Sequence, residues 1–204
     1  MELWGITGLM GAGRTTATQY LSGLGYPCID VDQATRLTVD RNTELGKEGF
    51  AQIYRIFGDS VLDRTGSLDR TALRKRIMMN PTENDKLQAA IDPLVLKYIE
   101  KTVKDWPSRG AKFGFVEGAR LVEAGYHNIL NGIIQVTAQL DKRINRLAKR
   151  DSMGKQEVEA MFRIQDREEL MRRVAKIQWK NDGSVKALQT QIDKFVAERE
   201  AVKR

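Results

Sequence analysis

The chain has 204 residues, a net charge of +7, 41% hydrophobic residues and one cysteine. This length and composition fit one compact α/β domain with a buried core. A single cysteine excludes an internal disulfide framework, no Cys/His cluster suggests zinc, and no apolar stretch approaches the roughly 18 residues that span a bilayer. We therefore expect a protein of the reducing cytoplasm with no membrane partner.

The first apolar run, residues 3–7, leads into a glycine-rich turn at residues 8–15, and a helical pattern over residues 16–24 follows. This order of strand, turn and helix is typical of a phosphate-binding P-loop, although Arg14 stands where the pattern has lysine. Thr15 would offer its hydroxyl to Mg²⁺. The alternative is a turn that binds nothing. The residues expected to bind the phosphates of a nucleotide are Gly8, Gly11, Ala12, Gly13, Arg14, Thr15 and Thr16.

A second apolar run, residues 26–31, brings two carboxylates to its end, Asp30 and Asp32. Residues i and i+2 of an extended chain share a face, so both carboxylates are expected to point the same way. Beside a P-loop, one acid can accept a proton from an attacking hydroxyl and the other can hold Mg²⁺. We assign Asp32 to the first role and Asp30, with Thr15, to the second. The alternative for Asp32 is a cap for a helix that starts at Gln33.

About eighty residues separate the second strand from the third, and their pattern is helical. Helices are expected over residues 43–57, from residue 68 to about 80, and over residues 83–103, the last interrupted or restarted at Pro93. Such an insertion is too long for a simple crossover. We therefore predict that residues 33–110 form a helical substrate-binding domain.

Three later apolar runs, residues 113–117, 133–137 and 177–180, complete a predicted five-stranded parallel sheet. Ligands bind at the carboxyl ends of such strands, so the glycine-rich turn, the two aspartates and Glu117 are expected around one crevice. Glu117 suits a position near the metal, with a helix cap or a pair with Arg120 as the alternatives. The predicted fold is a three-layer α/β/α P-loop type, whose nucleotide-binding core comprises residues 1–32, 111–140 and 175–204.

Residues 141–180 contain twelve Lys and Arg against seven Asp and Glu. Beside a P-loop, this excess favours a polyphosphate substrate over nucleic acid or an acidic membrane. Arg143, Arg146 and Arg150 fall on one helical face, and Arg163 and Arg167 on another. Two such faces in a helical lid, residues 141–174, would screen charge during transfer; the alternative is a solvated face with acidic partners.

Several motifs along the chain carry a family resemblance. They are GITG at residues 5–8, LGYPCIDVD at 24–32, FG at 57–58, GSLDR at 66–70, FVE at 115–117, then Arg146, Arg150, Asp151, Gln165 and NDG at 181–183. Together they resemble the dephospho-CoA kinase family of P-loop kinases, from Gly5 to about residue 185.

The resemblance implies ATP-dependent phosphorylation of the ribose 3′-hydroxyl of dephospho-CoA, the last step of coenzyme A biosynthesis, with ATP and Mg²⁺. Asp32 would be the base, Arg14 and the loop amides would hold the β- and γ-phosphates, and Thr15 would hold Mg²⁺. The remaining implied roles are acceptor binding by Asp30, Asp32, Arg36, Arg70 and Glu117, lid contacts and catalysis by Arg146, nucleotide binding by Arg150, and adenine binding by Asn181 and Gly183.

The chain departs from the family pattern at Arg14, Asp92, Thr137, Arg143 and residues 175–177. Because these positions are functional in the family, two alternatives stay open: a catalytically impaired nucleotide- or CoA-binding homologue, and a P-loop kinase for another small hydroxyl substrate. A nucleic-acid partner would require basic residues interleaved with aromatic ones, which this sequence lacks. The oligomeric state stays open.

Overall fold

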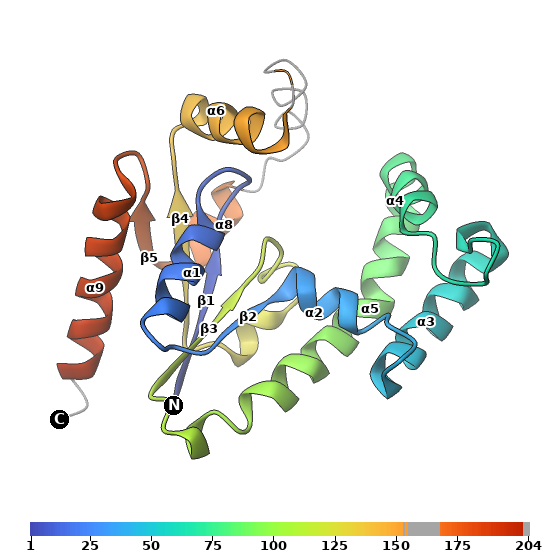
Figure 1. Ribbon diagram of the computed structural model, residues 1–204, viewed down its shortest axis with the longest axis horizontal. Coiled ribbons are helices and arrows are strands. Elements are labelled where there is room, and N and C mark those ends of the chain that lie inside the picture. Colours follow the sequence, from blue (N-terminus) through green and yellow to red (C-terminus); the bar gives the residue numbers. More distant parts are fainter. Residues whose placement is uncertain (153, 155–167, 202–204) are drawn as a thin grey trace. The chain divides into compact units, whose positions relative to one another are not determined.

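The structure is a computed structural model that describes residues 1–152, 154 and 168–201 (Figure 1). The chain divides into two compact units. The first comprises Met1–Cys28 and Trp106–Arg204, and the second comprises Ile29–Asp105.

A five-stranded sheet has the order β2-β3-β1-β4-β5. The central strand β1 pairs in parallel with β3 and β4, and β4 pairs in parallel with β5. The predicted parallel sheet of a P-loop fold is therefore confirmed. The strands are β1 Glu2–Thr7, β2 Cys28–Asp30, β3 Phe113–Glu117, β4 Gly132–Thr137 and β5 Ala175–Lys180.

The helices of the first unit connect and cover these strands. Helix α9 packs against both α1 and β5, and α8 packs against β4. The helices are α1 Arg14–Gly23, α6 Leu140–Asp151, α8 Glu168–Val174 and α9 Val185–Ala201, with short 3₁₀ turns η2 Pro107–Arg109 and η3 Tyr126–Ile129.

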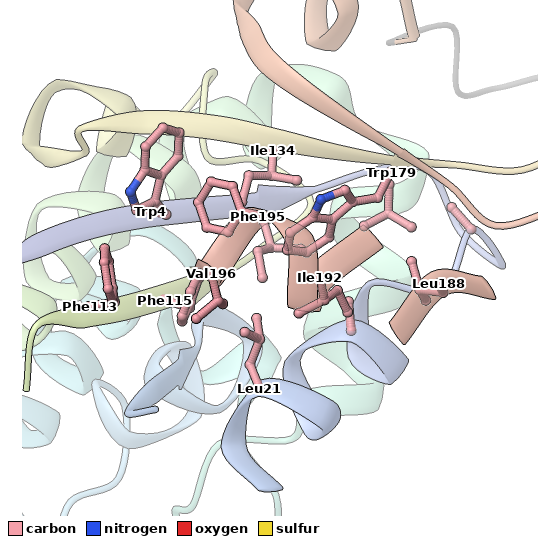
Figure 2. Close-up of a cluster of buried hydrophobic side chains, with 14 residues drawn as sticks. Trp4, Leu21, Phe113, Phe115, Ile134, Trp179, Leu188, Ile192, Phe195 and Val196 are labelled. Carbon is pink, nitrogen blue, oxygen red and sulfur yellow. The ribbon is translucent and has the colours of Figure 1, made fainter. Parts of the chain in front are cut away.

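An aromatic core joins the sheet to α1 and α9 (Figure 2). The ring of Phe195 meets Trp4, Trp179 and Phe115 edge-on, at centroid distances of 5.1, 5.7 and 6.5 Å. Leu21 of α1 is fully buried in the same cluster. Because this core fixes α1 against β1 and β3, it also fixes the turn between β1 and α1.

The second unit is helical, as predicted for the long segment between the second and third strands. Side chains cap the last three of its α-helices: Thr43 accepts from the Gly46 N–H, Asp69 from two N–H groups of α4, and Asn80 from the Glu83 N–H. The helices are α2 Val31–Leu37, α3 Glu44–Phe57, α4 Arg70–Met79 and α5 Pro81–Val103, with the 3₁₀ turn η1 Gly58–Val61.

The expected break at Pro93 is wrong, because α5 runs unbroken from Pro81 to Val103. Proline removes one intrahelical hydrogen bond, the one to the carbonyl of residue i−4. Here that carbonyl belongs to Ala89, and both Ala89 and Pro93 are exposed. Water can therefore hydrate the carbonyl, which limits the cost of continuing the helix.

The second strand also ends earlier than expected. Strand β2 stops at Asp30, and α2 begins at Val31. Asp30, rather than Asp32, is the N-cap: its Oδ1 accepts the N–H groups of Asp32 at 2.8 Å and Gln33 at 3.3 Å. Asp32 lies in the first turn of the helix, so the argument that both carboxylates share one face of a strand does not hold.

Among the described residues, no helix combines the length and apolarity needed to cross a lipid bilayer.

Candidate functional site

The glycine-rich turn closes tightly between β1 and α1. Gly8, Gly11 and Gly13 have φ values of 151°, 74° and 104°, a region that side chains disfavour. A Cβ atom on Gly11 would lie 2.7 Å from the Arg143 carbonyl oxygen, and one on Gly8 would collide with the Val136 carbonyl oxygen. Both backbone shape and neighbouring main chain therefore require glycine in this turn.

The turn delivers the N-terminus of α1 to the surface of the first unit. The first helical hydrogen bond runs from the Ala17 N–H to the Gly13 carbonyl at 3.1 Å, and no side chain caps the helix at Gly13. Helix N-termini of this kind bind anions through their backbone N–H groups and the helix dipole. The N–H groups that precede the first helical bond are those of Arg14, Thr15 and Thr16.

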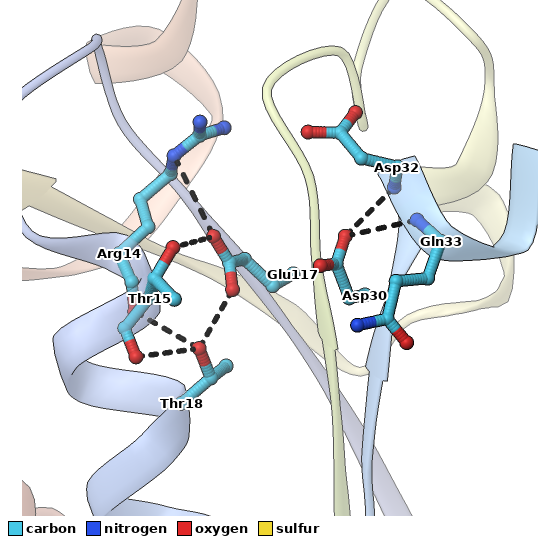
Figure 3. Close-up of polar contacts among 7 residues, drawn as sticks. All are labelled: Arg14, Thr15, Thr18, Asp30, Asp32, Gln33 and Glu117. Carbon is cyan, nitrogen blue, oxygen red and sulfur yellow. Dashed lines mark hydrogen bonds and ion pairs between the residues drawn. The ribbon is translucent and has the colours of Figure 1, made fainter. Parts of the chain in front are cut away.

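A buried carboxylate lies beside this helix N-terminus (Figure 3). The Thr15 hydroxyl donates to Glu117 Oε1 at 2.9 Å, the Thr18 hydroxyl donates to Oε2 at 2.7 Å, and Arg14 Nε lies 3.9 Å from Oε1. Glu117 is only 7% exposed, so these contacts offset the cost of burying its charge. The sequence did not single out Thr18, although it lies one helical turn after Arg14 and Thr15.

The oxygen atoms of Thr15 and Glu117 are the kind of donors that Mg²⁺ prefers. Mg²⁺ usually keeps several waters and binds through one or two protein groups together with substrate phosphates, rather than in a cage of side chains. In the described part of the chain, no three His, Cys, Asp or Glu side chains form such a cage. The residues at the turn therefore fit a metal that arrives with a nucleotide.

An open cavity of about 310 Å³ lies over the glycine-rich turn. It brings together predicted nucleotide-binding residues from the turn and from α6. Arg14 is 15% exposed, and its buried Nη1 has no hydrogen-bond partner among the described residues. The cavity is lined by Gly11, Gly13, Arg14, Thr15, Thr16, Gln19, Arg146, Leu147 and Arg150.

The arginines of α6 have partners within the first unit. Arg146 donates to the Gly11 carbonyl at 3.2 Å and to the Asn181 carbonyl at 2.6 Å. Arg150 forms an ion pair with Asp151 at 2.7 Å, and Arg143 donates from Nε to the Met10 carbonyl at 3.0 Å. Arg163, Gln165 and Arg167, expected to face the nucleotide from the same lid, lie outside the described residues.

The residues expected to hold adenine lie between β5 and α9. Asn181 is 6% exposed, and its side-chain amide donates to the Ala12 carbonyl at 2.8 Å. The Asn181 N–H donates to the carbonyl of Thr137, the last residue of β4. Gly183 is exposed in the turn that precedes α9.

The second unit contains a cavity of about 690 Å³ with a cationic lining. Arg36 and Arg70, both expected to bind an acceptor, line it, as do Arg41 and Phe50, which the sequence did not single out. The Arg41 guanidinium lies 4.6 Å from the centre of the Phe50 ring. Arg36 follows Asp32 by one turn of α2, and Asp32 is exposed.

Cys28 is expected to be chemically inert. Its Sγ lies 3.7 Å from the Thr18 carbonyl oxygen, and burial, with a smaller contribution from Glu117, raises the pKa of the thiol to about 12. At pH 8 only about one molecule in 10⁴ then carries the reactive thiolate. We predict no measurable alkylation by iodoacetamide at pH 8 in the native protein and full alkylation after unfolding in urea. Mass spectrometry counts the modified thiols, and rapid native labelling would contradict the prediction.

The parallel sheet, the glycine-rich turn at the N-terminus of α1 and the acidic end of β3 define a P-loop kinase. The family model for dephospho-CoA kinase matches residues 3–187. The chain therefore belongs to the dephospho-CoA kinase family, whose members are phosphotransferases.

Two relatives that are named dephospho-CoA kinases support this membership. A dephospho-CoA kinase from Neisseria gonorrhoeae is 33% identical over 192 residues, which cover 92% of this chain and 88% of the relative. One from Thermus thermophilus is 31% identical over 195 residues, covering 95% of this chain and 90% of the relative.

Solved structures show the same fold. A crystal structure of a Thermus thermophilus protein has a TM-score of 0.79 and 29% identity and covers 97% of both chains. Dephospho-CoA kinase from Campylobacter jejuni has a TM-score of 0.70 at 20% identity over both full chains. Shikimate kinase from Acinetobacter baumannii, with a TM-score of 0.54 and 16% identity, covers 100% of this chain and 95% of its own.

Proposed function

We propose that this chain transfers the γ-phosphate of ATP to the ribose 3′-hydroxyl of dephospho-CoA, the last step of coenzyme A biosynthesis. The family match over residues 3–187 carries this conclusion. The turn adds physical support, because it presents an uncapped helix N-terminus beside oxygen donors and cations.

On the nucleotide side, the N–H groups of Arg14, Thr15 and Thr16 would hold the phosphates. Thr15, with Asp30 or Glu117, would hold Mg²⁺, which when bound neutralises charge on the β- and γ-phosphates. The Thr15 hydroxyl donates its proton to Glu117 Oε1, so the lone pairs of its oxygen would stay available for the metal. We propose that Asn181 and Gly183 contact adenine and that Arg146 and Arg150 screen the developing charge.

Arg14 would take the place of the usual loop lysine. A guanidinium is planar and donates from several atoms in a fixed fork, whereas an ammonium is a compact point charge. Arg14 Nη1 is buried without a hydrogen-bond partner among the described residues, so it retains a donor for a phosphate oxygen. The fork can make two parallel bonds to one phosphate, which would recover part of what a lysine contributes.

On the acceptor side, we propose Asp32 as the base that takes the proton of the ribose hydroxyl. The acceptor carries a diphosphate and an adenine ring, both of which suit the cavity of the second unit. The arginines that line this cavity, Arg36, Arg41 and Arg70, would pair with phosphate oxygens of the acceptor, and Phe50 would contact its adenine ring. We propose that Asp30 and Glu117 complete the acceptor and metal contacts.

We further propose a cytoplasmic enzyme whose partners are ATP and dephospho-CoA, without nucleic-acid or membrane contacts. The basic excess of residues 141–180 then serves a polyphosphate ligand rather than a polymer.

The test is release of ADP from Mg-ATP, with and without dephospho-CoA, by wild type and Arg14→Lys. Acceptor-dependent release in the wild type supports the proposal, and mass spectrometry of the product should show one added phosphate. Recovery only in Arg14→Lys would instead indicate an impaired homologue with an intact acceptor site. Turnover with shikimate and not with dephospho-CoA would indicate another small hydroxyl substrate, and silence of both proteins would overturn the assignment.

A further inference from the structure

Every backbone carbonyl from Leu9 to Gly13 accepts a hydrogen bond. Two of the donors are main-chain N–H groups: Ala12 donates to Leu9, and Ala17 donates to Gly13, both at 3.1 Å. The other three donors are side chains from distant segments. They are Arg143 to Met10 at 3.0 Å, Arg146 to Gly11 at 3.2 Å and Asn181 to Ala12 at 2.8 Å.

Helix α6 reinforces this arrangement by direct packing. Met10 packs against a small apolar cluster that Ile144 and Leu147 form on α6. The backbone of Arg143 lies so close to Gly11 that a Cβ there would be 2.7 Å from the Arg143 carbonyl oxygen. Met10 and Gly11 are therefore held by one face of α6 through both main-chain and side-chain contacts.

The carbonyl partners matter because each peptide unit has two ends. A loop binds an anion with its N–H groups, and a peptide that rotates turns its negative carbonyl end toward the same place. Donors that occupy the carbonyls hold the peptides in the productive orientation before the anion arrives. Such preorganisation removes a cost from binding and from transition-state stabilisation.

We propose that Arg143 is a positioning residue for the phosphate-binding turn and that it acts through the Met10 carbonyl. Arg146 and Asn181 hold the next two carbonyls of the turn in the same way. The inference rests on the proposed use of ATP. Arg143 is 5% exposed and is not among the residues that line the cavity over the turn. Its route to the nucleotide therefore runs through Met10, whereas Arg146 lines that cavity itself.

The experiment compares Arg143→Met with Lys149→Met. Methionine keeps an apolar chain of similar reach in the buried position and removes the donor. Lys149 is an exposed cation on the same helix, so its replacement makes the same change of charge without touching the turn. Arg143→Lys restores a donor to the position. Arg143→Leu, which also lacks a donor, replaces the methionine variant in every comparison if that variant does not fold.

Three measurements are made on the full chain: ADP affinity by calorimetry, amide exchange of residues 8–16 without nucleotide, and the KM values for both substrates. For Arg143→Met we expect the affinity for ADP to fall about tenfold and the KM for ATP to rise about tenfold. This is the size of effect expected from the loss of one charge-assisted hydrogen bond. Exchange in the turn should quicken, the KM for dephospho-CoA should stay within about twofold, and Arg143→Lys should recover most of the affinity. Lys149→Met should match the wild type throughout.

Equal ADP affinity and equal exchange in Arg143→Met and the wild type would overturn the inference. So would an equal worsening of both KM values, because a general loss of structure affects both ligands. If the wild type itself neither binds ADP nor turns over, the proposed function fails instead. Affinity and exchange need no turnover, so the two failures are separable.

Discussion

Asp32→Asn is expected to lower kcat by about 10²–10⁴-fold while the affinity for ATP stays within about twofold. A positioned base contributes acceleration of this order, and an amide cannot take the proton of a hydroxyl. The substitution preserves the shape of the side chain and leaves the backbone N–H that Asp30 holds at the start of α2. Steady-state kinetics with both substrates, together with calorimetry of ADP binding, provide the measurement.

The surroundings of Asp32 indicate that Asp32→Asn should leave the folded structure unchanged. The Asp32 side chain is exposed and makes no hydrogen bond or ion pair with a described residue, so little stability depends on it. Asp85→Asn, an exposed acid on α5, is the matched control and should behave as the wild type. A kcat within about threefold of the wild type for Asp32→Asn would exclude Asp32 as the base. A drop shared by Asp85→Asn would point to charge in general rather than to one carboxylate.

Much of the fold could be predicted because its signals are local. Continuous apolar runs predicted the five strands, and the glycines of the turn predicted a backbone that the φ values of Gly8, Gly11 and Gly13 confirm. The errors are also local. Asp30 and Asp32 both suit an N-cap, and only the position where the backbone turns decides which residue accepts the N–H groups.

The hydrogen-bond network of the candidate site was harder to predict, because its contacts join residues that are far apart in sequence. Thr18 and Glu117 are 99 positions apart, Arg143 and Met10 are 133 apart, and Asn181 and Ala12 are 169 apart. Helical spacing correctly places Arg143 and Arg146 on one face of α6. Spacing does not say what that face contacts, and here it contacts loop carbonyls as well as the cavity.

Arg14→Ala is expected to lower kcat/KM for ATP by about 10²–10³-fold, the usual loss when one preorganised donor to a developing negative charge is removed. Arg14→Lys should stay within about tenfold of the wild type, because an ammonium retains the charge without the planar fork. Arg109→Ala, an exposed arginine in the same unit, is the matched control and should have no effect. Initial rates over a range of ATP concentrations give the comparison.

The ion pair between Arg14 and Glu117 allows a second test of this prediction. The Arg14 Nε lies 3.9 Å from Glu117 Oε1, which also accepts the Thr15 hydroxyl. The same carboxylate therefore restrains both the loop cation and the hydroxyl that we propose as a metal ligand. If that restraint positions Arg14, Glu117→Gln should lower kcat/KM for ATP in the wild-type background. The same substitution should lower it less in the Arg14→Lys background, because the effects of two residues in contact are not additive. Equal costs in both backgrounds would mean that Glu117 acts on the metal or the acceptor and not through Arg14. An Arg14→Ala variant with wild-type kinetics would show that the backbone N–H groups alone hold the phosphates in this protein.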